Sequence, residues 1–271
     1  MTPITLLEER AAWAGAHALL IFVAVLALLL LALWAGNWAL CHGGARLSLA
    51  WPRVRPRGAA RFLAGGTVVV LGSATLVEVA EHLRHGTTLV RLDMAFNAAL
   101  HASLPDSALQ VFGALTHLGD TAMLSALCIG VALALVAAGR RGLALGWVVA
   151  VAGNSLLNQG LKQFFGRVRP LQAAGGVLEG GYSFPSGHSS GSLVAYGMLA
   201  YLALRVLPLR WHLPAMMAAV ALAWTVGASR SFLGVHFASD VFAGFASGAA
   251  WLALCITGMG IVRSMQRPPA A

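Results

Sequence analysis

The stretch AHALLIFVAVLALLLLALWAGNWAL, residues 16–40, carries no Asp, Glu, Lys or Arg. A helix needs about 20 mainly apolar residues to cross the hydrocarbon core of a membrane. Lipid offers no partners to exposed backbone N–H and C=O groups, so a helix is favoured, and the stretch is too long for a barrel strand. The sequence therefore predicts a membrane-spanning helix over residues 16–40.

Six further apolar stretches extend this prediction along the chain. They are residues 62–80, 119–138, 143–163, 187–206, 212–230 and 238–262. Of the 271 residues, 59% are hydrophobic and 10% are charged, whereas soluble domains carry about 25% charged residues. We therefore expect an all-α protein, a multi-pass transmembrane helical bundle with seven spans. The half-polar region 81–118 is predicted to form interfacial helix and loop, with a turn at Leu104-Pro105-Asp106.

The net charge of +9 could indicate a nucleic-acid partner, but the arrangement of the charges favours a membrane. Most arginines form short clusters between apolar runs, which is how membrane proteins fix their orientation. With seven spans, eleven of them fall on one side, which the positive-inside rule makes cytoplasmic. These are Arg46, Arg53, Arg55, Arg57, Arg61, Arg140, Arg141, Arg205, Arg210, Arg263 and Arg267. We predict a bacterial plasma-membrane protein that starts outside, ends inside and binds no nucleic acid.

Four basic residues gather against this rule at the outer ends of the fourth and sixth spans. They are Lys162, Arg167, Arg169 and Arg230. An anionic ligand explains their position, because catalysis of phosphoryl transfer is mostly positioning and charge stabilisation. Pro185-Ser186-Gly187 nearby resembles a helix start at which Ser186 is the N-cap and free backbone N–H groups face an anion.

Two histidines complete the candidate site at the outer face. His236 and Asp240 are four residues apart, so on a helix they share one side. The carboxylate can then hold Nδ1–H of His236 and leave Nε2 as a nucleophile. His188, at the predicted helix start, is the candidate general acid for the leaving oxygen. A helix N-terminus disfavours a protonated histidine, so a phosphate dianion would have to offset this effect.

Together these residues resemble the three-part signature of the type-2 phosphatidic acid phosphatase (PAP2) superfamily. All eleven positions are present in order, as Lys162-x6-Arg169-Pro170, Pro185-Ser186-Gly187-His188 and Ser229-Arg230-x5-His236-x3-Asp240. The resemblance implies that His236 is phosphorylated, that Asp240 orients it and that His188 is the acid. It also implies phosphate binding without a metal or cofactor, by Lys162, Arg169, Ser186, Gly187 and Arg230. Membrane members usually have six spans, so it implies a six-helix phosphatase core plus one extra N-terminal span.

Each motif has a structural interpretation when it is taken alone. The proline–serine–glycine–histidine motif is a capped helix start, the lysine–arginine motif is an interfacial anchor, and the histidine–aspartate pair is a helix contact. Their occurrence together, in order and on one side, favours catalysis. Arg167 is either a substrate contact or an interfacial anchor. Asn154 and Asn158 are expected to bond neighbouring helices within the bundle.

The sequence predicts three parts: N-terminal spans and an interfacial segment over residues 1–118, a catalytic membrane core over 119–262, and a cytoplasmic tail over 263–271. The expected function is metal-independent hydrolysis of a lipid phosphate or pyrophosphate through phosphohistidine at the extracytoplasmic face. The partners are then the bilayer and a phospholipid or polyprenyl phosphate, with undecaprenyl pyrophosphate as one candidate. Two alternatives stay open: a lipid phosphotransferase that uses the same site, and a non-catalytic lipid-binding protein.

Overall fold

The computed structural model describes residues 3–42, 58–170 and 180–265, and these residues form helices and no strands. The first helices are α1 (Pro3–Ala16), α2 (Ala18–His42), α4 (Gly58–His85) and α5 (Thr87–Ser103). They are followed by α6 (Asp106–Thr116), the 3-10 turn η1 (His117–Gly119), α7 (Thr121–Ala137) and α8 (Arg141–Phe165). The last are α9 (Gly187–Val206), the 3-10 turn η3 (Leu209–Trp211), α10 (His212–Phe232) and α11 (Ala238–Met265). The prediction of an all-α fold is confirmed.

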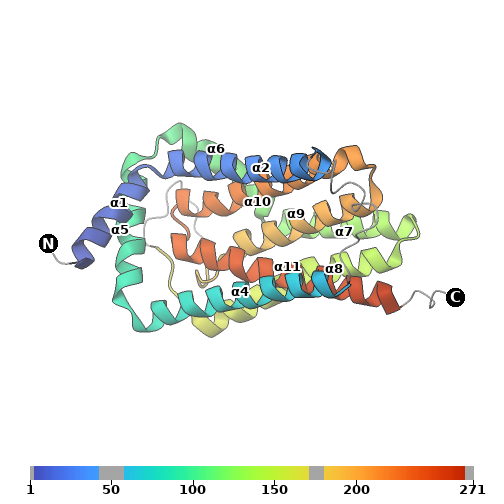
Figure 1. Cartoon of the computed structure of the whole chain (residues 1–271). Helices are drawn as coiled ribbons and strands as arrows, with labels where there is room; N and C mark the ends of the chain where they lie inside the picture. The colour runs from blue at the N-terminus through green and yellow to red at the C-terminus, as the bar shows by residue number, and fades with distance from the viewer. Residues whose placement is uncertain (1–2, 43–57, 171–179, 266–271) are drawn as a thin grey trace.

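The long helices run side by side along one axis, and α1 and α5 lie across one end of the bundle (Figure 1). At that end α1 packs on α5. The outer helices α2 and α4 contact α10 and α11 respectively. Helices α8 and α10 end, and α9 and α11 begin, at the end that α5 crosses (Figure 1). The helix ends that carry the predicted site residues therefore share one end of the bundle.

The arginines predicted to be cytoplasmic lie at the opposite end wherever the structure describes them. Arg140 precedes α8, and its Nη1 donates to the carbonyl oxygen of Arg205, near the end of α9, over 3.5 Å. Arg263 lies in the last turn of α11. The remaining predicted positions Arg46, Arg53, Arg55, Arg57 and Arg267 lie outside the described residues.

Each of the seven apolar stretches falls on a helix, but the helices differ in how well they suit a membrane. By length and composition, four in the described ranges can cross one: Ala18–Ala39, Phe62–Arg84, Leu209–Phe232 and Ala238–Met265. A fifth span arises if α6–η1 and α7, which meet at 43°, form one broken span. Helices α8 and α9 do not qualify, since they carry buried polar residues such as Asn154, Asn158 and Ser190. That these two cross the membrane stays a prediction.

The region 81–118 is more helical than the sequence predicts. Helix α4 continues to His85, and α5 and α6 occupy most of the remainder. The predicted turn is confirmed, because Leu104 and Pro105 have extended backbone between the two helices. Helix α5 buries Asp93, Asn97 and Leu100. A segment expected to be interfacial helix and loop therefore contributes side chains to the interior.

A close backbone approach joins α9 to α11. A Cβ atom placed on Gly244 of α11 would lie 2.6 Å from the carbonyl oxygen of Ser186 and 3.0 Å from Cβ of Ser189. One turn further along, a Cβ on Gly248 would lie 3.0 Å from the backbone of Ser190. Small residues allow this kind of contact between membrane helices. Gly244 thus sets the distance between α11 and the start of α9, where the predicted helix cap lies.

Replacing Gly244 with alanine should disturb this contact. The backbone of Ser186 cannot move away from the added methyl group without shifting the start of α9, and such overpacking costs about 1–3 kcal/mol. We expect Gly244→Ala to lower the melting temperature of the purified protein in detergent by several degrees. Gly258→Ala on the same helix is the control, because nothing lies within 4 Å of a Cβ there. Equal melting temperatures for the two variants would contradict the contact.

Candidate active site

A cavity of about 680 Å³ lies among α7, α8 and α9 and contains residues from all three predicted motifs. Its wall includes Lys162 of α8, Gly187 and His188 of α9, and His236 from the connection between α10 and α11. We call this space the histidine cavity. Four predicted site residues that are far apart in the sequence are thus brought together.

His236 is 1% exposed, and the hydrogen bond at its Nε2 identifies its tautomer. Nη1 of Arg169 lies 3.1 Å from Nε2. A guanidinium group can only donate, so Nε2 accepts, and the proton of the neutral ring lies on Nδ1. Nδ1 is 3.5 Å from Oδ2 of Asp240 and has no hydrogen-bond partner among the described residues. The distance from Nδ1 to Oδ2 is within the range of an ion pair but is long for a hydrogen bond. Hydrogen bonds of catalytic groups often shorten only when substrate binds.

The environment of His236 keeps the ring neutral. Burial lowers its pKa to about 4, and the charges of Arg169 and Arg230 act in the same direction. Asp240 favours the protonated ring but does not outweigh burial. At pH 7 Nε2 therefore carries a lone pair, which is what a nucleophile requires.

Asp240 is fully buried and is held from several directions. Its Oδ2 accepts from the backbone N–H of Phe237 over 3.0 Å, and its Oδ1 accepts from Nη1 of Arg167 over 2.6 Å. The carbonyl oxygen of Asp240 accepts from the backbone N–H of Ser186 over 3.0 Å. These bonds tie the start of α9, the start of α11 and the segment after α8 to the carboxylate that faces His236.

Arg167 links two buried carboxylates on different helices. Beside its bond to Asp240, its Nη2 donates to Oδ2 of Asp93 on α5 over 2.8 Å. Nη1 also donates to Oγ of Ser239 over 2.8 Å, and the guanidinium lies 4.3 Å from the centre of the Phe237 ring. In the structure the side chain of Arg167 bridges two buried acids, and the two roles considered for it, substrate contact and interfacial anchor, stay predictions.

Asp93 is a residue that the motif analysis missed. Burial raises its pKa, although hydrogen bonds from Ser239 and Arg167 act against this shift. Asp93 lies far upstream of the motifs, so no spacing rule connects it to Arg167. A weak signal was available: Asp93, Asn97 and Leu100 fall on one side of a helix, and all three are buried.

His188 also has a partner that the motifs do not contain. Its Nε2 lies 2.9 Å from Oδ1 of Asp120, a residue between η1 and α7. The other oxygen of Asp120 lies 2.7 Å from Nδ1 of His117, whose side chain is largely exposed. A protonated His188 therefore has a negative partner within the protein itself. The start of α9 disfavours a protonated His188, and the sequence analysis expected the substrate phosphate alone to counteract this effect. The carboxylate of Asp120 provides part of the negative charge that does so.

Three of the predicted phosphate-binding residues, Arg169, Ser186 and Arg230, do not line the histidine cavity. Ser186 is fully buried and accepts from the N–H of Ser189 over 3.4 Å, which confirms the predicted N-cap of α9. Arg230 is 1% exposed. Its Nη1 donates to Oγ1 of Thr116 over 2.7 Å, and its carbonyl oxygen accepts from the N–H of His236 over 3.2 Å.

Asn154 and Asn158 connect α8 to α9. Both Nδ2 groups donate to Oγ of Ser190, over 3.4 and 3.2 Å respectively. That of Asn158 also lies 3.5 Å from the carbonyl oxygen of Pro185. These bonds match the predicted role within the bundle. Among the described residues, no group of three or more His, Cys, Asp or Glu side chains is arranged to hold a metal ion.

The family model of the PAP2 superfamily matches residues 142–262. Phosphatidylglycerophosphatase B of Bacillus subtilis (strain 168) is 35% identical over 141 residues, which cover 51% of this chain and 69% of that protein. The chain belongs to the PAP2 superfamily. A solved structure, the transmembrane PAP2-type phosphatidylglycerolphosphate phosphatase from Bacillus subtilis, matches this PAP2 protein with a TM-score of 0.67 and 29% identity. The match covers 73% of this chain and 98% of that one.

The chain is therefore a membrane phosphatase of the PAP2 superfamily. All eight predicted site residues fall within the matched residues 142–262, whereas Asp93, Thr116 and Asp120 lie outside them. The roles of the eight residues, and the division of the PAP2 chain at residues 118 and 262, stay predictions.

Removing the cation of Arg167 should unbalance the two buried carboxylates. Arg167→Gln leaves Asp93 and Asp240 without their shared partner, and breaking a buried ion pair from one side costs about 3–5 kcal/mol. We expect the melting temperature in detergent to fall by about 5–10 °C and phosphatase activity to fall about tenfold or more.

The double variant Arg167→Gln/Asp93→Asn is the matched control. The Asp93→Asn change removes the carboxylate of α5 that Arg167 neutralises in the wild type. The melting temperature of the double variant should therefore lie well above that of Arg167→Gln alone. Its activity should stay low, because Asp240 still lacks a donor at Oδ1. A double variant no more stable than Arg167→Gln would argue against the bridge.

Proposed function

We propose that the chain hydrolyses a phosphate monoester or pyrophosphate on a lipid, and that the phosphoryl group passes through Nε2 of His236. The observation that carries the proposal is the state of His236: the ring is buried and neutral, and its Nε2 lone pair faces the guanidinium of Arg169. A second histidine, His188, lies in the same cavity with its own carboxylate partner. Membership of the PAP2 superfamily supports phosphatase chemistry.

Arg169 has two tasks in this proposal. Before substrate binds, its donated hydrogen bond occupies the lone pair of Nε2. A phosphate group offers the guanidinium stronger, charge-assisted and bidentate bonds, so Arg169 turns to the phosphate oxygens and leaves Nε2 free. As Nε2 attacks, the ring becomes positive, and Asp240 stabilises it through the proton on Nδ1.

The reaction has two steps. In the first, Nε2 of His236 bonds to phosphorus, the bond from phosphorus to the leaving oxygen breaks, and His188 gives that oxygen its proton. In the second, water attacks phosphorus, His188 takes a proton from the water, and the phosphorus–nitrogen bond breaks. Inorganic phosphate leaves, and both histidines return to their starting states. Asp120 supports the protonated form of His188 that the first step needs.

The remaining positive charge stabilises the phosphoryl group. Lys162 lines the histidine cavity and places an ammonium group near the phosphate oxygens. Arg230 contributes its charge from beside His236. The capped start of α9 at Ser186 and Gly187 directs backbone N–H groups at the anion. All of these interactions act on charge that spreads over the equatorial oxygens in the transition state.

The substrate is proposed to be a lipid because the site lies at the end of two candidate spans. One ends at Phe232 and the next begins at Ala238, so His236 lies directly between them. The histidine cavity also continues along α7 and α8 to apolar side chains such as Ile129 and Val151, which provide a path for an acyl chain. A headgroup at His236 can therefore react while its tails remain in the bilayer.

The site is proposed to face the extracytoplasmic side of a bacterial plasma membrane. Arg140 and Arg205 lie at the opposite end of the bundle, and the positive-inside rule favours the cytoplasm for that end. The named activity of the Bacillus subtilis relatives makes phosphatidylglycerophosphate the first lipid to test. Undecaprenyl pyrophosphate is the second.

A trapped phosphoenzyme tests the proposal. The purified chain is mixed with phosphatidylglycerophosphate that carries ³²P in its terminal phosphate, and the reaction is stopped with alkaline detergent. We expect a transient protein label that survives alkali and is lost in acid, as a phosphorus–nitrogen bond requires. His236→Gln should give no label and release phosphate about 10³-fold more slowly or worse. Label in this variant, or rapid release without any label in the wild type, would refute the mechanism.

A substrate whose leaving group needs no proton tests the role of His188 in each of the two steps separately. With p-nitrophenyl phosphate the departing oxygen needs no proton, so His188→Gln should still become labelled. Water then lacks its base, and the label should accumulate. Supplying a lipid alcohol in the same assay distinguishes hydrolysis from transfer, because a transferase would convert the label into phospholipid and not into free phosphate.

The partner of His188 makes a separate prediction about pH dependence. Asp120→Asn removes the negative partner of the protonated ring, so less of the acid form survives as the pH rises. In a plot of kcat against pH, the fall at alkaline pH should therefore begin at a lower pH than in the wild type. The rise at acid pH should stay in place. Asp106→Asn, at the exposed start of α6, should leave the profile unchanged. A uniform fall in kcat at every pH would indicate that Asp120 is merely structural.

A further inference from the structure

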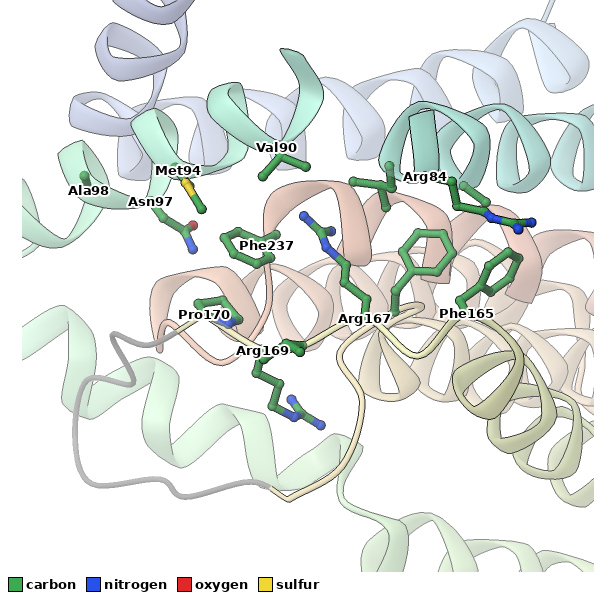
Figure 2. A pocket seen from close by; sticks show the side chains of 14 residues that line it. Arg84, Val90, Met94, Asn97, Ala98, Phe165, Arg167, Arg169, Pro170 and Phe237 are labelled. Atoms are coloured by element: carbon green, nitrogen blue, oxygen red, sulfur yellow. The ribbon is translucent and has the colours of Figure 1, made fainter. Parts of the chain in front are cut away.

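A second cavity lies on the other side of the segment that follows α8. It has a volume of about 700 Å³ and lies between the end of α4, the side of α5 and residues 165–170 (Figure 2). Ten of its fourteen wall residues are apolar. The other four are Arg84, Asn97, Arg167 and Arg169, and none is acidic. We call this space the α5 cavity. Its size lies within the range of about 300–1,000 Å³ that is usual for small-molecule sites.

Asn97 is the unexplained group in this cavity. Its side chain is 3% exposed, and neither Nδ2 nor Oδ1 has a hydrogen-bond partner among the described residues. Leaving buried polar groups unsatisfied costs about 1–3 kcal/mol each. The amide projects from α5 beside Met94 (Figure 2), so a ligand in the cavity that both accepts and donates hydrogen bonds would remove this cost.

Arg84 places a positive charge near one end of a candidate span. It lies in the last turn of α4, which ends at His85 and contains this span, and long basic side chains near the ends of spans reach toward the headgroup region. Ala80 and Leu83, which precede it on α4, form the apolar wall below. Arg84 makes no hydrogen bond or ion pair with any residue that the structure describes, and basic pockets beside membrane helices attract anionic lipid headgroups.

We propose that the α5 cavity is a binding site for an anionic phospholipid, separate from the catalytic site. The lipid phosphate pairs with Arg84, an ester oxygen accepts from Nδ2 of Asn97 while a headgroup hydroxyl donates to its Oδ1, and an acyl chain lies against the apolar wall. A soluble anion would leave that wall exposed to water, and a neutral lipid would leave Arg84 unpaired. The combination of the Arg84 cation, an orphan amide and an apolar surface therefore selects a lipid with a negative headgroup.

The α5 cavity is distinct from the histidine cavity although the same segment borders both. Figure 2 shows the side chains of Arg167 and Arg169 pointing to opposite sides of the chain. Arg169 reaches His236, whereas Arg167 reaches Asp93 of α5. A lipid in the α5 cavity would therefore contact the bridge that holds Asp240 without reaching the nucleophile.

The binding of dioleoyl phosphatidylglycerol tests the proposal. The full chain in detergent is mixed with equal amounts of this lipid and dioleoyl phosphatidylcholine, and native mass spectrometry counts the lipids that stay bound. We expect the wild type to retain phosphatidylglycerol preferentially. Arg84→Gln should lower the preference about fivefold, and Ala98→Trp, which fills the cavity from α5, should remove the bound lipid.

Three variants serve as controls. Arg210→Gln removes an arginine at the other end of the bundle, and Ala102→Trp adds the same bulk one turn further along α5, outside the cavity wall. Both should behave as the wild type. Lys162→Gln changes the histidine cavity and should leave retention intact. Equal retention of the two lipids by the wild type, or a loss in Lys162→Gln but not in Arg84→Gln, would overturn the proposal.

Asn97→Leu provides an independent measurement. The leucine has a similar volume and no polar group, so it should be at least as stable as the wild type in phosphatidylcholine alone. Added phosphatidylglycerol should raise the melting temperature of the wild type more than that of Asn97→Leu. An equal rise in both proteins would show that the amide does not meet the lipid. The test needs no phosphatase activity, so it stands apart from the outcome for His236.

Discussion

The ion bridge of Arg167 between Asp93 and Asp240 is the interaction on which the site depends. Both carboxylates are almost completely buried, and a buried charge is tolerated only when it is paired and hydrogen-bonded. The two acids belong to α5 and α11, while the arginine follows α8, so neutralising them forces three parts of the fold together. The hydrogen bond from Ser186 to the backbone of Asp240 then adds α9 to the same assembly.

This assembly explains how one histidine can stay neutral among so many charges. Burial and the two flanking arginines disfavour the protonated form of His236. Asp240 alone would favour it, but one oxygen of that carboxylate is already committed to Arg167. The remaining oxygen can steady the proton on Nδ1 without binding a full positive charge before the reaction begins. One oxygen of Asp240 thus binds Arg167 while the other faces His236. This arrangement suits His236, because the ring becomes cationic only when Nε2 attacks phosphorus.

The sequence predicted the parts of this arrangement that follow from local spacing. The cap at Ser186 and the turn at Leu104-Pro105 depend on neighbouring residues, and both are confirmed. The grouping of Lys162, His188 and His236 follows from antiparallel helices that end on one side. The partners Asp93 and Asp120 could not be predicted in this way, because each lies far along the chain from the residue it binds and belongs to no repeated spacing. Tertiary packing alone selects them from the available acids.

The same reasoning explains why α8 and α9 fall below the other long helices in hydropathy and why the bridge formed by Arg167 was not predicted. Hydropathy describes a helix by its average, so polar side chains such as Asn154 and Ser190 lower the average even though they bond to each other inside the bundle. Likewise, a charge rule counts Arg167 and Arg169 as equivalent cations at one membrane face. Side chains two residues apart in a non-helical segment can point to opposite sides, and here one meets buried acids while the other meets a nucleophile. Neither arginine can take the place of the other, because Arg167 points to Asp93 and Asp240 while Arg169 points to His236. Position and not charge count therefore distinguishes the structural cation from the one proposed to bind substrate.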